Sequence, residues 1–153
     1  MKVLVLSDSH GNLKNLEFAI KNFPHDMIFF LGDGYKDFKA FSDEEIYAVK
    51  GNCDFFVPAE EEEILEIEGN KIMLCHGHLF GVKYTMSEIA KKAQKENLKL
   101  VCFGHTHKFL NMEIDGCTFL NPGSIGAMCE NSFALLTISK SNIKIVKVPV
   151  ANN

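Results

Sequence analysis

The chain has 153 residues, of which 46% are hydrophobic and 24% charged, an ordinary composition for one globular domain with a sizeable core. Its formal net charge of −4 gives no overall basic field, which argues against a dedicated polynucleotide binder. Five cysteines without a Cys-x-x-Cys spacing argue against a disulfide framework or a thiolate zinc site. No apolar run approaches the roughly 18 residues of a membrane span, and the first run is too short for a signal-peptide core, so we expect a cytoplasmic protein.

The first third of the chain alternates predicted strands and helices. Residues 13–22 carry an apolar stripe at helical spacing, with Asn12 as a plausible N-cap and Pro24 ending the element. A short helix is expected at residues 38–41. The apolar runs that predict buried strands are residues 1–7, 26–31 and 45–50.

The rest of the chain turns toward antiparallel strands. Residues 60–68 and 71–75 predict a hairpin with its turn at Gly69-Asn70. Residues 85–96 predict a helix capped by Thr85 or Ser87. The remaining expected strands are residues 98–103, 110–114, 117–120, 132–138 and 143–148, with a turn at Asp115-Gly116. This order, without a linker or repeat, predicts one α/β domain over residues 1–153, with two packed sheets and helices outside.

Five of the expected strands end in residues that can bind a metal. In residues 100–107 the apolar run stops at Gly104, and His105 and His107 project to the same side of an extended segment. The full candidate set is Asp8, His10, Asp33, Asn52, His76, His105 and His107. Ligands of open α/β sheets bind beyond the carboxyl ends of strands, so we expect these side chains to meet at one edge.

The number and type of these side chains indicate the metals. Seven nitrogen and oxygen ligands are too many for one tetrahedral ion, but they suit two ions that share a carboxylate. Without a thiolate, the set suits Mn, Fe, Co, Ni or Zn rather than copper(I) or an iron–sulfur cluster. Any one of the histidines alone could be a packed or surface residue, and the aspartates could cap helices; their joint placement at strand ends favours a metal site.

Other residues beside the strand ends have open roles. His78, two residues after His76, is expected to support a ligand or contact substrate. Asp54 either forms an ion pair in a turn or acts near the substrate. Residues 121–124 predict a Pro-Gly turn. Phe55 and its neighbour Phe56 could line a substrate pocket or a dimer contact, although core packing is the default role for phenylalanine.

In chain order, the motifs of this sequence resemble those of the calcineurin-like metallophosphoesterase superfamily, and their spacing resembles its small bacterial and archaeal phosphodiesterase branch. The motifs are Asp8-x-His10, Gly32-Asp33, Gly51-Asn52, His76-Gly77-His78 and Gly104-His105-Thr106-His107. The resemblance extends from Asp8 to Ser124, because Asn121-Pro122-Gly123-Ser124 resembles a further motif that lies near the metals in the family. It implies a four-layer α/β/β/α sandwich with two mixed β-sheets and the helices on the outside.

The resemblance also implies a ligand set and a reaction. One metal would be held by Asp8, His10, Asp33 and His107, and the second by Asp33, Asn52, His76 and His105, with Asp33 bridging. Mn²⁺ is the implied metal, with Ni, Fe, Co or Zn as alternatives. The implied reaction is hydrolysis of a small phosphodiester through in-line attack by a hydroxide that bridges the two metals.

One departure from the family concerns the proton donor. Many members carry a His directly after the motif Asn, where it contacts substrate, but this chain has Cys53. A thiol, whose usual pKa is about 8.5, is a poor general acid for an alkoxide. Either Asp54 or His78 replaces this acid, or the enzyme needs a good leaving group. Together with Asn52, these two residues are the candidate catalytic residues.

Other functions stay open beside the diesterase. The eukaryotic retromer subunit resembles this branch and is regarded mainly as a binding platform, so a same-fold interaction scaffold with weak or no catalysis is one alternative; the complete ligand set favours an enzyme. A phosphomonoesterase would need cations for the second phosphate charge, and no Lys or Arg lies inside the motifs. A nuclease would need a basic groove, so we expect neither stable nucleic-acid binding nor membrane association. The sequence leaves a homo-oligomer open.

Overall fold

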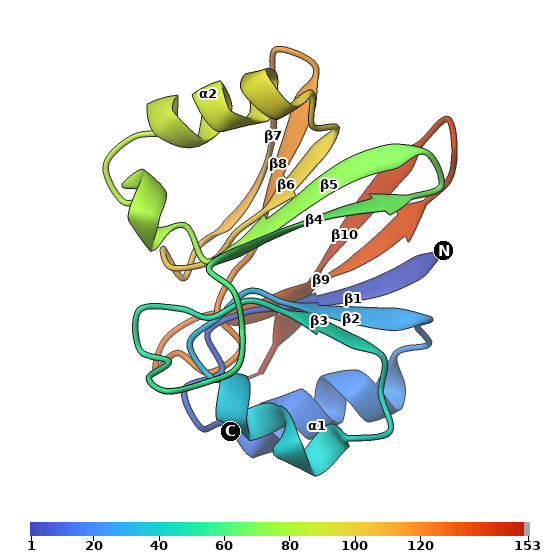
Figure 1. Cartoon of the computed structure of the whole chain (residues 1–153). Helices are drawn as coiled ribbons and strands as arrows, with labels where there is room; N and C mark the ends of the chain where they lie inside the picture. The colour runs from blue at the N-terminus through green and yellow to red at the C-terminus, as the bar shows by residue number, and fades with distance from the viewer. Residues whose placement is uncertain (152–153) are drawn as a thin grey trace.

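The computed structural model describes residues 1–151, and its strands form two five-stranded mixed sheets (Figure 1). In the first sheet the order is β10-β9-β1-β2-β3, with β1, β2 and β3 parallel and β9 antiparallel to both of its neighbours. Its strands are β1 (Lys2–Leu6), β2 (Met27–Phe30), β3 (Ile46–Ala48), β9 (Asn131–Ile138) and β10 (Ile143–Val150). The predicted residues 152 and 153 of the domain lie outside the described part.

The second sheet has the order β4-β5-β6-β8-β7. Its three inner strands are parallel, and each edge strand is antiparallel to its neighbour. The strands are β4 (Glu62–Ile67), β5 (Asn70–Cys75), β6 (Leu100–Cys102), β7 (Phe109–Ile114) and β8 (Cys117–Pro122). Parallel strands in both sheets direct their carboxyl ends toward the same side of the molecule.

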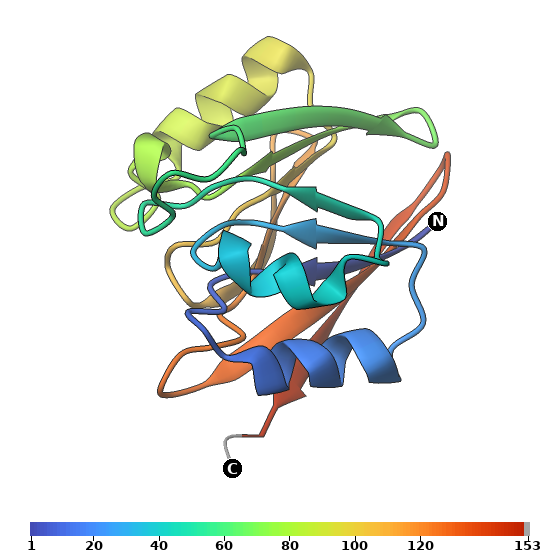
Figure 2. The same cartoon turned by 60° about the horizontal axis from the view of Figure 1, so that its bottom comes forward.

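The helices cover the two outer faces. On the first sheet lie α1 (Leu13–Asn22) and the 3₁₀ helix η1 (Tyr35–Phe41), and on the second lie η2 (His78–Phe80) and α2 (Ser87–Glu96). Figures 1 and 2 show α1 and α2 at opposite ends of the stacked sheets. The predicted α/β/β/α sandwich is therefore confirmed. Within residues 1–151, no helix is long and apolar enough to span a membrane.

Apolar side chains fill the three spaces between the four layers. Phe29 and Leu74 are fully buried between the sheets. Leu16 of α1 packs with Phe133 on the outer face of the first sheet, and Ile89 of α2 packs within the cluster on the outer face of the second. Strands buried on both faces explain the unbroken apolar runs in the sequence.

Most predicted elements are found, with ends that shift by a few residues. Helix α1 has its predicted N-cap, because the Asn12 side chain accepts a hydrogen bond from the Asn15 N–H at 3.0 Å. The predicted cap of α2 is wrong. Its N-cap is Met86, which makes no side-chain cap bond, and Thr85 instead accepts from the Ser87 N–H at 3.1 Å.

The predicted hairpin between β4 and β5 exists, but its turn lies one residue earlier than expected. Ile67 pairs with Asn70, so the two loop residues are Glu68 and Gly69. Both have positive φ, 52° and 76°, as a type I′ turn requires. The Asn70 side chain is used elsewhere: it donates to the carbonyls of Ile67, Glu68 and Ser139.

This turn can be tested with two substitutions. Gly69→Ala meets no atom within 4 Å but needs an unfavourable φ, so we expect it to lower the free energy of unfolding by about 1 kcal/mol. Glu68→Asn places a residue that tolerates positive φ, and we expect a gain of roughly 0.5 kcal/mol. Urea denaturation with chelator present measures both. If Glu68→Asn left the free energy of unfolding unchanged, that result would contradict the Glu68-Gly69 turn.

Candidate metal centre

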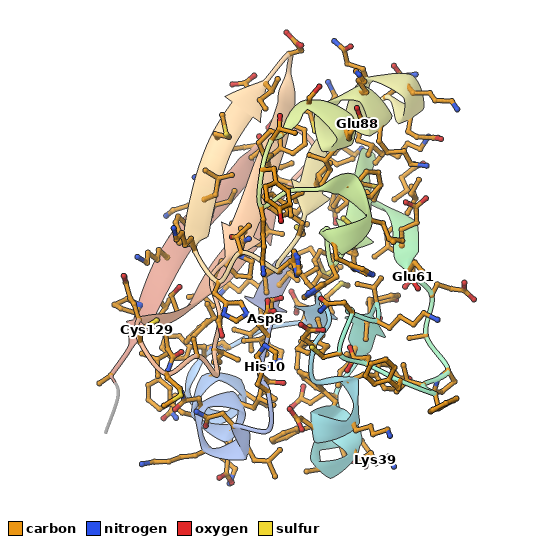
Figure 3. The ribbon with its side chains drawn as sticks, turned by 90° about the vertical axis from the view of Figure 1, so that its left-hand side faces the viewer. Asp8, His10, Lys39, Glu61, Glu88 and Cys129 are labelled. Carbon is orange, nitrogen blue, oxygen red and sulfur yellow. The ribbon has the colours of Figure 1, made fainter. Side chains whose placement is uncertain are left out.

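The predicted ligands follow the carboxyl ends of β1, β2, β3, β5 and β6, where the two sheets face each other. Figure 3 shows Asp8 and His10 between the α1 end and the α2 end of the molecule. The structure brings six of the seven predicted ligands into two adjoining groups of three. Metal binding by these two groups stays a prediction.

The first group contains Asp8, His10 and His107. The Asp8 Oδ1 atom lies 3.2 Å from His107 Nε2 and 3.7 Å from His10 Nε2, and the two imidazole nitrogens are 3.4 Å apart. Asp8 is fully buried, whereas the side chains of His10 and His107 are 34% and 39% exposed. This group therefore forms the open side of the site.

The second group contains Asp33, His76 and His105. His76 Nε2 lies 3.2 Å from Asp33 Oδ2 and 3.2 Å from His105 Nδ1. The His76 side chain is fully buried and that of Asp33 is 4% exposed. This group forms the closed side of the site.

Both carboxylates lie between the two groups. Asp33 Oδ2 is 3.9 Å from His10 Nε2 of the first group, and Asp8 Oδ1 is 3.8 Å from His76 Nε2 of the second. An oxygen that faces imidazoles of both groups is suitably placed to bridge two cations. The predicted bridging role of Asp33 agrees with this position.

Asn52, the seventh predicted ligand, lies in the loop after β3 and is exposed. Its side-chain amide is 3.6 Å from Cys53 Sγ, and the Cys53 N–H donates to Asp33 Oδ1 at 2.8 Å. Asn52 itself is outside the two groups, but the next residue, Cys53, contacts Asp33 of the second group. Burial, followed by the charge of Asp33, raises the pKa of the Cys53 thiol.

The two groups fit divalent cations, as one buried atom shows. Asp8 Oδ1 is buried and, among residues 1–151, has no hydrogen-bond partner. A buried carboxylate oxygen without a partner is costly, and three imidazole nitrogens converge on this one. A cation held between the oxygen and these nitrogens would satisfy all of them, and the lack of thiolates suits the harder divalent ions.

Hydrogen bonds from neighbouring residues orient the ligand atoms. Asp8 Oδ2 accepts from the Ser7 hydroxyl and from the His105 N–H, which leaves Oδ1 facing the imidazoles. The Nδ1 atom of His76 lies 2.7 Å from the Leu31 carbonyl, so Nδ1 carries the proton. The lone pair of His76 Nε2 is then available to a metal, a common arrangement for metal-binding histidines.

The backbone is strained at the same residues. The predicted ligands with positive φ are Asp8 (54°), His10 (44°), Asp33 (61°), His105 (69°) and His107 (62°). Such conformations cost of order 1–3 kcal/mol each outside glycine, although Asp and His tolerate them better than most residues. Gly104 packs so closely on Ser7 and Asp8 that a Cβ atom there would overlap both side chains. The extended segment predicted at His105 and His107 is therefore wrong, and the left-handed backbone at the ligands lowers the stability of the fold.

Charge interactions inside the site shift pKa values in both directions. Asp8 raises the pKa of His10. For His76, burial acts to lower the pKa, but the carboxylates of Asp33 and Asp8 outweigh it and raise the pKa. Burial raises the pKa of Asp8, but the nearby imidazoles of His10 and His107 outweigh it and hold that pKa well below its ordinary value. Burial, with the charge of His76, lowers the pKa of His105 to about 4. A carboxylate and a neutral imidazole are the forms that bind metals.

Asp54 has a positioning role in this structure. Its carboxylate accepts hydrogen bonds from the backbone N–H groups of four residues: Asp33, Gly34, Tyr35 and Gly51, at 2.7 to 3.0 Å. Both oxygens are used, so the carboxylate ties the loop after β3 to the loop after β2. This contact favours the turn role that the sequence left open over direct contact with substrate.

His78 lies beside the second group, where its ring centroid is 5.4 Å from that of His76 and 6.1 Å from that of His105. Its Nε2 atom is 3.5 Å from Glu61 Oε2, and its Nδ1 atom is buried without a partner among the described residues. Burial, followed by the charge of His76, lowers the pKa of His78. His78 is therefore close enough to support a ligand or to meet a substrate.

Residues 121–124 lie against the site, but the predicted Pro-Gly turn is wrong, because Asn121 and Pro122 are the last residues of β8. The Asn121 side chain donates to the Gly104 carbonyl at 2.9 Å and to Thr106 Oγ1 at 3.0 Å. The Ser124 hydroxyl donates to the Asp8 carbonyl at 2.8 Å. This segment thus holds two ligand loops in place. The signal in the sequence was its resemblance to a further motif of the family.

Comparisons with known proteins identify the family of this chain. The family description "Calcineurin-like phosphoesterase superfamily domain" matches residues 1–141. The chain is 34% identical over 143 residues to a probable metallophosphoesterase of Bacillus subtilis, covering 90% of this chain and 85% of that protein. A Streptococcus pneumoniae structure described as a predicted phosphoesterase gives a TM-score of 0.83 at 28% identity, covering 97% of this chain and 88% of that chain.

A third similar protein is Vps29 of Entamoeba histolytica, in a structure described as complexed with zinc. It gives a TM-score of 0.75 at 25% identity, covering 97% of this chain and 99% of that chain. The chain belongs to the calcineurin-like phosphoesterase superfamily. It is accordingly a metallophosphoesterase, a hydrolase, and the family implies divalent metal ions.

The positioning role of Asp54 can be separated from a catalytic one. Asp54→Asn keeps one acceptor oxygen and turns an NH₂ group toward backbone N–H groups. We expect it to lower the free energy of unfolding by roughly 2 kcal/mol. We also expect Mn²⁺ affinity to fall by about tenfold. Urea denaturation and calorimetry measure these changes.

The matched control is Asp43→Asn, which removes the same charge from an exposed residue and should change neither quantity. An Asp54→Asn variant with normal stability and metal affinity but no turnover would instead show a direct catalytic role.

Proposed function

We propose that this protein is a divalent-metal-dependent phosphodiesterase that hydrolyses a small phosphodiester by in-line displacement. The observation that carries the proposal is the convergence of imidazole nitrogens on the buried, unpartnered Oδ1 of Asp8, next to a second Asp–His–His group. Two adjoining groups of this kind support a dinuclear centre. Mn²⁺ is the proposed metal because the resemblance to the small phosphodiesterase branch implies it; carboxylates and imidazoles without a thiolate suit Fe, Co, Ni or Zn as well.

The residues of the two groups have different proposed roles. Two ions bound here would polarise phosphoryl oxygens and make water a stronger acid. Asp8 and Asp33 supply the negative charge that holds such ions. The buried side chain of His76 closes the inner side, whereas the exposed edges of His10 and His107 leave the outer side open. We therefore place the substrate phosphate on the outer side.

His78 is the proposed contact for the leaving group. It lies next to His76 and His105, and its Nε2 atom is 3.5 Å from Glu61 Oε2. Asp54, the other candidate, is occupied by four backbone N–H groups. Asn52 keeps its predicted roles as metal ligand and substrate contact.

Two observations bear on the alternatives. The similarity to Vps29 favours an interaction scaffold as a second candidate. The sequence argument against a phosphomonoesterase was the lack of cations inside the motifs, but the fold brings Lys36 into a cavity lined by His10 and Asp33. Activity measurements must therefore compare diester with monoester.

The proposed function is tested by hydrolysis of bis(4-nitrophenyl) phosphate and of 4-nitrophenyl phosphate. After chelator treatment we expect no turnover of either ester, and addition of Mn²⁺ should restore cleavage with a higher kcat/KM for the diester. His76→Ala, which removes a buried predicted ligand, should lower kcat by at least about a hundredfold.

The control is His25→Ala. His25 contacts Phe23 and Glu44 and no residue of the two groups, so its loss should leave metal-dependent kcat unchanged. A higher kcat/KM for the monoester would replace the proposal with a phosphomonoesterase. Absence of any turnover with both metals bound would favour the scaffold.

A further inference from the structure

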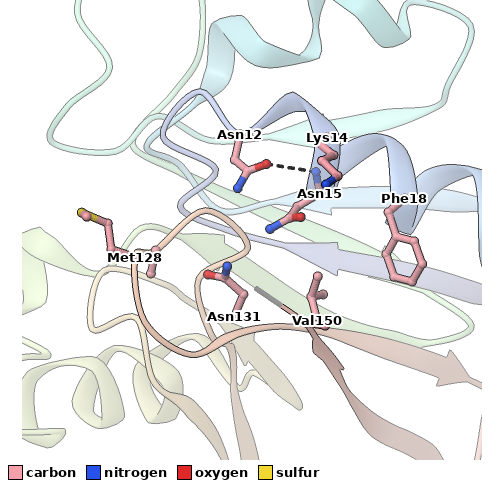
Figure 4. A pocket seen from close by; sticks show the side chains of 9 residues that line it. Asn12, Lys14, Asn15, Phe18, Met128, Asn131 and Val150 are labelled. Carbon is pink, nitrogen blue, oxygen red and sulfur yellow. Dashed lines mark hydrogen bonds between the residues drawn. The ribbon is translucent and has the colours of Figure 1, made fainter. Parts of the chain in front are cut away.

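A cavity of about 250 Å³ opens directly beside the candidate metal centre. His10 and Asp33 line one side of it, and η1 with the loop after β3 lines the other. A different cavity of about 340 Å³ lies beside the start of α1, near Asn12 and Phe18 (Figure 4). No predicted ligand lines the cavity beside α1, whereas His10 and Asp33 line the cavity beside the metal centre. A substrate bound to the metals would therefore enter the cavity beside the metal centre.

Two acidic residues of this cavity are already engaged in holding its walls. Asp37 accepts from the Ser9 hydroxyl at 2.6 Å and from the Gly11 N–H at 2.9 Å, which ties η1 to the loop after β1. Asp54 ties the loops after β2 and β3 together. The walls are therefore fixed relative to the ligand groups, and these carboxylates serve structure rather than cation binding.

Lys36 is the cation of the cavity. The chain contains no arginine, so lysine is the only side chain that can bring a permanent positive charge. Lys36 lies in η1 next to Asp37 and is exposed. Within residues 1–151, its ammonium group has no hydrogen bond or ion pair, in contrast to lysines such as Lys21 and Lys147. An anionic group that enters the cavity would find this charge available.

Phe55 presents an aromatic ring at the same cavity. It directly follows Asp54, so the hydrogen bonds of Asp54 also fix its backbone. Its side chain remains 67% exposed, and it makes no ring contact with another aromatic residue of the described chain. The next residue, Phe56, is fully exposed and does not line the cavity. An exposed ring beside a phosphate site is a suitable stacking surface for a base or another flat ring.

We propose that this cavity binds the part of the substrate that carries an aromatic ring and a second anionic group, as in a nucleoside phosphodiester with an additional phosphate. Phe55 stacks on the ring, and Lys36 pairs with the additional charge. The inference rests on the proposed phosphodiesterase function and deepens it by naming the class of substrate. The cavity is smaller than the pockets of about 300–1,000 Å³ that enclose drug-sized ligands, so it takes one part of the substrate only.

Three diesters with the same 4-nitrophenolate leaving group test the proposal. They are methyl 4-nitrophenyl phosphate, thymidine 5′-(4-nitrophenyl phosphate) and its 3′-phosphorylated form. We expect kcat/KM to rise about tenfold from methyl to thymidine through stacking. The 3′-phosphate should add about threefold through the exposed lysine, with a smaller gain at high salt. Equal values for all three diesters would overturn the proposal.

Matched variants assign the two effects to their residues. Phe55→Ala should lower the thymidine-to-methyl ratio, and Lys36→Met should lower the ratio of the 3′-phosphorylated to the unphosphorylated nucleoside diester. The controls are Phe56→Ala and Lys39→Met, which alter the neighbouring ring and the neighbouring η1 lysine and should leave both ratios unchanged. Equal effects of test and control variants would contradict the assignment.

Binding without turnover separates this inference from the proposed function. Calorimetry with thymidine 3′,5′-bisphosphate and the Mn²⁺-loaded protein should show weaker binding to Lys36→Met and Phe55→Ala than to the control variants. If no diester is hydrolysed while this pattern holds, the proposed function fails and the cavity assignment stands. Hydrolysis of the methyl diester without any preference for thymidine would retain the function and overturn the cavity assignment.

Discussion

The buried carboxylate of Asp8 is the constraint on which the site depends. One oxygen is held by Ser7 and by the backbone of His105, and the other is left without a hydrogen-bond partner while His10, His76 and His107 converge on it. In a protein interior this arrangement is unfavourable unless a cation completes it. Asp8 therefore joins the first sheet, through β1, to ligands that the second sheet supplies.

The four-layer fold explains how distant segments meet at this residue. Parallel strands of both sheets end at the same side, and strained, left-handed residues then turn the ligand side chains inward. Polar side chains outside the ligand set hold the loops in place. Asp54 binds the loop after β2, Asn121 binds the loop after β6 at Gly104, and Ser124 binds the loop after β1 at Asp8. Substrate recognition can then use residues outside the ligand set, such as Lys36 and Phe55.

The sequence predicted the layers, and it predicted that the candidate ligands would meet, which six of the seven do, because both leave local patterns. Buried strands produce apolar runs, and a polar ligand at the end of such a run is visible without a structure, as at His105. Features set by tertiary contacts were missed. No local pattern near Asp54 indicates that its carboxylate accepts hydrogen bonds from the loop after β2. Likewise, no motif predicts that Lys36 lies in the same cavity as His10. The turn at Glu68-Gly69 was misplaced because Gly69-Asn70 has equally suitable residue types, and pairing of Ile67 with Asn70 decided the register.

The central claim is that two adjoining groups hold two metal ions around Asp8. Its most direct test is the number of Mn²⁺ ions bound per chain, measured by calorimetry on protein freed of metal and confirmed by elemental analysis. The account predicts two ions for the natural sequence. It predicts a loss of affinity on Asp8→Asn, because the neutral amide removes the charge that both groups face. Binding of no ion, or of one ion that is indifferent to Asp8→Asn, would contradict it.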